Sequence, residues 1–173
     1  MPKTRRYARI LVSLAALGWL WGLVPTPIVA QDLPQARFQT YTNTRFGYHI
    51  LYPADFTAQG ESDNGDGQAF TNSDGAVLSV WGGYNVLGEK PAEALRRELQ
   101  RCAQSRRQIT YRRTGKTFLV ISGYEADGQQ IFYLKKLMRS DVQIGFELVY
   151  PIAHRARYDR EVVTIANSLR LHS

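Results

Sequence analysis

Alternating apolar and polar positions divide the first half of the chain into short strands separated by turn-forming residues. In residues 47–52, Tyr48, Ile50 and Tyr52 share one face, and Pro53 ends the run because it has no N–H to donate. Residues 68–71 and 76–81 are predicted to form a hairpin, because Gly75 in the turn between them tolerates positive φ. A loop rich in acidic residues, Gly and Asn precedes this hairpin.

The second half has the pattern of a β-meander. Strands are expected at residues 108–112, 117–125, 129–138 and 142–150, and a short edge strand at residues 37–41. In residues 117–125 both faces are apolar, which predicts a central strand covered on both sides.

Two amphipathic helices complete the pattern. Pro91 is typical of a helix start, and the first helix is expected to end near Gln104, with Leu95, Leu99 and Cys102 on one buried face. The second helix ends near Arg170, and its apolar residues recur at helical spacing: Tyr158, Val162, Ile165 and Leu169. We therefore predict an α+β fold, an antiparallel sheet of about six to seven strands flanked by helices in an α-β-α sandwich.

The first 30 residues are predicted to be a signal peptide that is cleaved after Ala30. Four basic residues precede an apolar run at positions 10–24, and Pro25 ends that run. The run is shorter than the ~20 residues that span a bilayer, so no stable transmembrane segment is expected after cleavage. Arg5 and Arg6 suggest the twin-arginine export route, but Ala8 stands where such signals prefer a larger apolar residue. The twin-arginine route and the general secretory route therefore both stay open. A periplasmic or secreted location follows.

Removing this segment changes the charge. Four of the 22 basic residues and none of the 15 acidic residues lie in it, so 18 basic residues remain and the net charge falls from +7 to +3. We expect a flexible leader at residues 31–37 and a single domain at residues 38–171. Cys102 is the only cysteine, which excludes an intramolecular disulfide.

The strongest candidate site is the acidic loop, residues 60–68, with Glu61, Asp63, Asn64 and Asp66 as candidate ligand or metal contacts. Carboxylate and amide oxygens of this kind bind calcium. The spacing differs from an EF-hand, because Gly65 stands where that motif has Asp or Asn. The alternative is that these residues only turn the chain. No other cofactor is expected.

A basic patch follows in residues 96–116, which hold eight basic residues against Glu98 alone. It predicts binding to an anionic surface, or else a solvated helix face. No nucleic-acid module accompanies it, so no nucleic acid is expected. Its candidate residues are Arg97, Arg101, Arg106, Arg107, Arg112 and Arg113.

Catalytic signatures are missing from the sequence, which has no nucleophile elbow, P-loop or zinc-protease motif. We therefore expect no catalytic residue and a protein that is not an enzyme. The alternative is a hydrolase that uses His49 with the loop carboxylates. Trp81 and Tyr84 are peripheral candidates for a binding groove, or else core residues.

Three stretches together resemble the PsbP-like superfamily. They are Phe46 to Pro53, the strand meander, and the closing residues 162–169. The resemblance runs from about Phe38 to Leu169 and implies an α-β-α sandwich that is not catalytic, since the superfamily includes extrinsic photosystem II subunits and a nuclear-import factor that binds a small GTPase. Residues 59–68 also resemble a loop in a group of small exported bacterial proteins. No interaction residue carries over, because no matching motif is present.

These observations favour an exported, non-catalytic binding or accessory domain with a protein partner in the cell envelope. The acidic loop and the neighbouring aromatic residues are its expected surface. The alternatives are the His49 hydrolase and an envelope protein that binds anionic surfaces through the basic patch.

Overall fold

The computed structural model describes residues 37–172, which belong to a compact unit that spans Pro34–Ser173. The predicted signal peptide, its cleavage after Ala30 and all of the leader except Arg37 lie outside the described residues. Among the helices that are described, none has the length and apolar character needed to cross a membrane.

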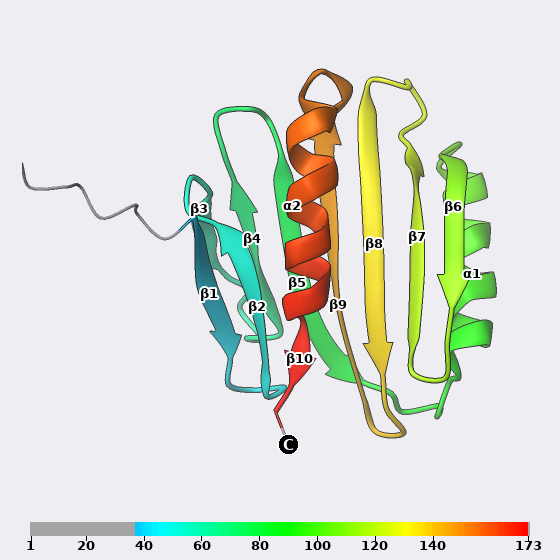
Figure 1. The fold of residues 1–173 in the computed structure, drawn as a ribbon. Helices are drawn as coiled ribbons and strands as arrows, with labels where there is room; N and C mark the ends of the chain where they lie inside the picture. The colour runs from blue at the N-terminus through cyan, green and yellow to red at the C-terminus, as the bar shows by residue number, and fades with distance from the viewer. Residues whose placement is uncertain (1–36, 173) are drawn as a thin grey trace, which may run out of the picture. The chain divides into compact units, whose positions relative to one another are not determined.

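A seven-stranded antiparallel sheet forms the centre of the fold (Figure 1). Its spatial order is β3 (Thr57–Glu61), β4 (Gly67–Thr71), β5 (Val77–Tyr84), β9 (Val142–Pro151), β8 (Gln130–Met138), β7 (Phe118–Tyr124) and β6 (Gln108–Thr114). The predicted meander and hairpin are therefore confirmed. The prediction that residues 117–125 form a central strand was wrong: β7 lies next to the edge, and β9 is the central strand. Strand β7 has the apolar pattern of a central strand because α1 covers one of its faces.

A second, three-stranded sheet has the order β1 (Phe38–Asn43), β2 (Tyr48–Pro53) and β10 (Arg170–Leu171). Together with α2 (Arg155–Ser168), which follows a 3-10 turn at Ile152–His154, it covers one face of the large sheet (Figure 1). Tyr48 and Ile50, both fully buried, pack there against Phe146 and Leu148 of β9 and Ile165 of α2. This layer is the larger of the two hydrophobic cores.

Helix α1 (Pro91–Gln104) covers the opposite face, where it lies over β6 and β7 and its buried side chains reach those of β8. Its start follows the prediction: Pro91 is the first residue, and the Glu93 carboxylate accepts a hydrogen bond of 3.0 Å from the Lys90 N–H. The predicted buried face is rotated. Leu95 and Leu99 are half-buried, while Ala94, Glu98 and Cys102 point inward. Glu98, rather than one of the predicted leucines, lies at the centre of this face because Lys136 of β8 neutralises its charge.

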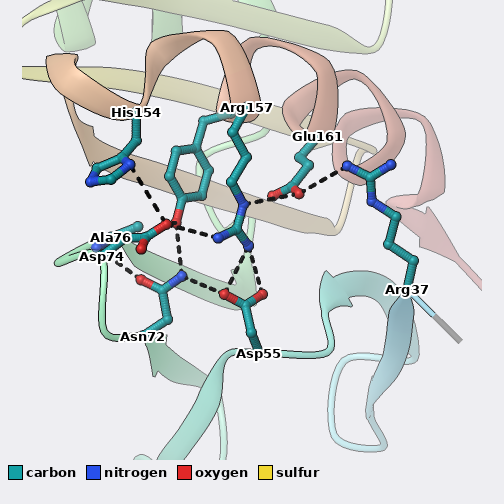
Figure 2. Close-up of polar contacts among 9 residues, drawn as sticks. Arg37, Asp55, Asn72, Asp74, Ala76, His154, Arg157 and Glu161 are labelled. Atoms are coloured by element: carbon teal, nitrogen blue, oxygen red, sulfur yellow. Dashed lines mark hydrogen bonds and ion pairs between the residues drawn. The ribbon is translucent and has the colours of Figure 1, made fainter. Parts of the chain in front are cut away.

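Arg157 connects α2 to the turns beneath it (Figure 2). Its guanidinium lies 2.7 Å from both Asp55 Oδ1 and Asp74 Oδ2, and 3.1 Å from Glu161 Oε1. The Tyr158 hydroxyl donates to Asp74, and burial together with that hydrogen bond raises the pKa of Tyr158 to about 12. Three segments far apart in sequence, the turns that hold Asp55 and Asp74 and helix α2, are thereby fixed around one cation, which makes this cluster a structural connection.

Candidate functional site

Several loops lie together at one end of the large sheet, here called the loop end. They are the β1–β2 turn (44–47), the acidic loop between β3 and β4, the β5–α1 loop (85–90) and the β8–β9 turn (139–141). The β1–β2 turn, the β5–α1 loop and the β8–β9 turn run along the lower edge of Figure 1. Contacts of these loops with one another and with the end of β5 hold them together: the Gly82 N–H donates to Asp66 O, the rings of Phe46 and Tyr84 are 5.2 Å apart, and the Asn85 N–H donates to Asp141 O.

The oxygens of the acidic loop are largely used within the turn. Asp66 Oδ1 accepts from the Ser62 hydroxyl at 2.6 Å, and Asp66 Oδ2 accepts from the Asn64 amide at 2.9 Å. Glu61 is directed toward the first sheet, where its Oε1 accepts from the Tyr41 hydroxyl at 2.8 Å. No three His, Cys, Asp or Glu side chains of residues 37–172 form a group that could hold a metal ion. A calcium ion would have to displace these hydrogen bonds, so the arrangement does not favour the calcium site that the sequence suggests.

The acidic loop is also attached to the β1–β2 turn. The Asn43 amide donates to Gly65 O at 2.9 Å, and the Arg45 guanidinium donates to Asn64 O. Arg45 in turn lies over the Phe46 ring, 5.1 Å from its centre. Through Phe46 the acidic loop is therefore connected to Tyr84. The structure thus places the loop and one of the two predicted aromatic candidates on the same end of the molecule.

The contacts of His49 and Trp81 are with residues outside the acidic loop. The polar contact of His49 is with His172, at 3.0 Å between Nδ1 and Nε2. A catalytic pair of His49 with a loop carboxylate is thus not the arrangement of the structure. Trp81 points to the opposite side of β5 from Tyr84, toward α1, where it lines a cavity.

The cavity under α1 has a volume of about 330 Å³ and a charged lining: Trp81, Glu98, Arg101, Cys102, Ser105, Arg107, Leu134, Lys136 and Glu147. Lys136 donates to Glu98, and Arg107 donates to Glu125 and Glu147. Burial raises the pKa of the Cys102 thiol, so this cysteine is protonated at neutral pH and is a poor nucleophile. The lining is a network of paired charges in which no nucleophile and base are combined.

The predicted basic patch is divided by the fold. Arg97 pairs with Glu89 at 2.5 Å and Arg101 with Glu98 at 3.2 Å. Arg107 turns inward to its two glutamates, with only 21% of its side chain exposed. Three exposed candidates form no ion pair within residues 37–172: Arg106 in the turn after α1, and Arg112 and Arg113 on the edge strand β6.

The most exposed apolar residues of the loop end were not predicted as a site. Val86 and Leu87, in the β5–α1 loop, are 86% and 90% exposed, and Tyr84 beside them is 64% exposed. The stretch has no periodic apolar pattern, and Gly82, Gly83 and Gly88 surround it. Two adjacent aliphatic residues between turn formers are the signal that would have identified it.

Asn85, which is 6% exposed, holds this loop in place. Its amide donates to Glu89 O and Arg139 O, its Oδ1 accepts from the Glu89 N–H, and its own N–H donates to Asp141 O. These hydrogen bonds attach the loop to the β8–β9 turn. Val86 and Leu87 are thus presented to solvent by a fixed backbone.

A pocket of about 240 Å³ opens beside the two apolar residues, lined by Tyr84, Asn85, Val86, Leu87, Glu89, Arg97 and Gln143. Two of its lining residues carry buried polar atoms that have no hydrogen-bond partner among the described residues, Arg97 Nε and Gln143 Oε1. A buried unpaired donor or acceptor costs about 1–3 kcal/mol and calls for an explanation.

Comparison with known proteins shows the fold. The structure is similar to the solution structure of cyanobacterial PsbP (CyanoP) from Synechocystis sp. PCC 6803, with a TM-score of 0.58 and 16% identity over 82% of this chain and 96% of that one. It is also similar to a crystal structure from Bacteroides thetaiotaomicron VPI-5482, with a TM-score of 0.52 and 13% identity. The latter match covers 80% of this chain and 50% of the Bacteroides chain.

No family model matches the sequence, and no curated protein matches it. The predicted PsbP-like fold is therefore confirmed by structure, at a level of identity that shows the fold alone.

Proposed function

We propose that this protein is an exported, non-catalytic accessory domain that binds a protein partner in the cell envelope, in the periplasm or outside the cell. The observation that carries the proposal is the exposure of Val86 and Leu87 on a loop that Asn85 holds rigid. Exposed apolar side chains on a fixed backbone lose little entropy on binding, so they are suited to insertion into a partner's pocket. The signal peptide at residues 1–30 accounts for the location.

The polar atoms around the tip favour a protein over a lipid surface. The pocket beside the tip is lined by the polar residues Asn85, Arg97 and Gln143, and acyl chains cannot form hydrogen bonds with such a lining. Glu89 and Arg97 neutralise each other in the same pocket, so its lining has no net positive charge that would attract anionic headgroups. The acidic loop and Tyr84, at the same end, extend the proposed surface toward the β1–β2 turn.

The test compares the size of the protein's complexes in extracts of the native cell envelope. The double substitution Val86→Ser with Leu87→Ser removes the apolar tip and, because both residues are exposed, is expected to change folding stability by less than about 0.5 kcal/mol. We expect the wild type to sediment as part of a larger species and the double variant to sediment alone.

A matched control uses Ile152→Ser with Val163→Ser, two other exposed apolar residues, which are 41% and 56% exposed and lie on the 3-10 turn and α2. This control variant is expected to sediment like the wild type. Sedimentation of the Val86–Leu87 variant with the wild-type complex would contradict the proposal. If the wild type sedimented only with lipid vesicles and with no protein, the tip would be assigned to a membrane surface instead.

A further inference from the structure

His49 and His172 form a pair that the sequence does not reveal, because 123 positions separate them. His172 Nε2 lies 3.0 Å from His49 Nδ1, and the ring centres are 5.1 Å apart. Both rings lie at the surface, where water reaches them. Neither residue belongs to the apolar tip, so this pair is independent of the proposed function.

Strand pairing fixes the positions of both histidines. In the register of β10 against β2, Arg170 is opposite His49 and Leu171 is opposite Tyr48. The pairing extends one residue further, since the His172 N–H donates to Gly47 O at 2.6 Å. His49 and His172 therefore lie diagonally on one face of two paired strands. A ligand that bound both imidazoles would pay little to order them.

The separation of the two nitrogens suits a shared metal ion. Imidazole nitrogens bind Zn²⁺ at ~2.0–2.1 Å, so two of them around one ion are roughly 2.9 Å apart in a square-planar site and roughly 3.3 Å apart in a tetrahedral one. The observed 3.0 Å lies within this range. We propose that His49 and His172 form a binding site for a divalent transition-metal cation of the class Zn²⁺, Ni²⁺ and Cu²⁺.

The surroundings define what the site can hold. Within residues 37–172 no third His, Cys, Asp or Glu completes a group of three ligands, so water fills the remaining positions. Two imidazoles select borderline transition metals over Mg²⁺ and Ca²⁺, which prefer oxygen ligands. The cation nearest in the register, Arg170, donates to Leu169 O and lines a separate pocket with Leu137 and Arg139. A bound metal would connect β10 to β2 and so fasten the end of the chain.

Calorimetric titration of the chain from Gln31 onward, prepared without a histidine tag, tests the site. This chain includes both hydrophobic cores and the whole unit from Pro34. With ZnCl₂ at neutral pH we expect one equivalent to bind to the wild type. His49→Gln and His172→Gln are each expected to weaken binding at least tenfold, and MgCl₂ is expected to give no signal.

His154→Gln is the matched control, because His154 is the one other histidine of the sequence and lies on the 3-10 turn, away from the pair. It is expected to bind zinc like the wild type. Zinc affinity that is equal in the wild type, His49→Gln and His172→Gln would overturn the proposal, as would the absence of zinc binding to the wild type at millimolar concentration.

Discussion

The Lys136 ammonium lies 2.7 Å from the Glu98 carboxylate, and each of the two side chains is only 8% exposed. This pair lies between α1 and the sheet, beside Trp81. Ion pairs in such positions add little stability over apolar residues of the same volume, but removing one partner leaves a buried charge unpaired. We therefore expect the pair to influence how α1 lies on the sheet more than how much it stabilises the packing of α1.

Glu98→Ala is expected to lower the free energy of unfolding by about 3 kcal/mol, because Lys136 would be left buried without its partner. The double variant Glu98→Met with Lys136→Met should recover most of that loss. Denaturant unfolding measures both, with Arg96→Ala on the exposed side of α1 as control. A double variant less stable than Glu98→Ala alone would show that the pair is net stabilising and refute this reading.

Arg157→Met is expected to cost about 2 kcal/mol in the free energy of unfolding. The substitution removes the hydrogen bonds to Asp55 and Asp74 and leaves Glu161, which is 4% exposed, with a weaker contact to Arg37 at 3.3 Å. Arg160→Met, an exposed position on the same helix, is the control. If both variants unfold at the same denaturant concentration as the wild type, the cluster around Arg157 does not hold α2 in place.

Acid should weaken the same cluster. Burial raises the pKa of Asp55, but hydrogen bonds from Arg157 and Asn72 outweigh it and hold the pKa below its usual value of 3.8. A depressed carboxyl pKa adds stability above the unfolded value, and this is lost as pH falls through the folded value. The stability difference between the wild type and Asp55→Asn should therefore be constant above about pH 5 and shrink below about pH 4. A difference that grows on acidification would contradict this assignment.

The acidic loop can be tested through thermal unfolding with calcium and with a chelator. Because Asp66 already accepts from Ser62 and Asn64, we expect no calcium-dependent shift in the unfolding temperature. Asp66→Ala should cost about 1 kcal/mol through loss of these hydrogen bonds, and Asp63→Ala, in the same loop, should be close to neutral. A rise with calcium that Asp66→Ala abolishes would instead establish a metal site.

Local patterns predicted most of the fold. Pro91 and Gln104 bound α1 as expected, and the turn residues of the meander fixed four strands to within two residues. Strand β3 was missed because Thr57–Glu61 has no apolar alternation and all its residues are exposed. Strand β10 was missed because two residues carry no periodic signal, and its pairing with β2 is a long-range contact.

The candidate sites were less predictable, because they depend on contacts between distant segments. Glu98 points inward only because Lys136 faces it from a strand 38 positions later, and Arg107 leaves the basic patch for Glu125 and Glu147. The sequence shows where charged residues stand, but it does not show which residue each of them pairs with in the fold. Sequence could place Val86 and Leu87 together, whereas their rigidity follows from hydrogen bonds of Asn85 to the β8–β9 turn.

The most direct test of the proposed function is photo-crosslinking in intact cells, with a photoreactive amino acid at position 87. The account predicts a discrete protein adduct from position 87 and none from position 163, which is exposed on α2. The adduct should disappear when Asn85→Ala releases the loop, although the protein remains folded. Equal adducts from both positions, or none from position 87, would contradict a partner-binding tip.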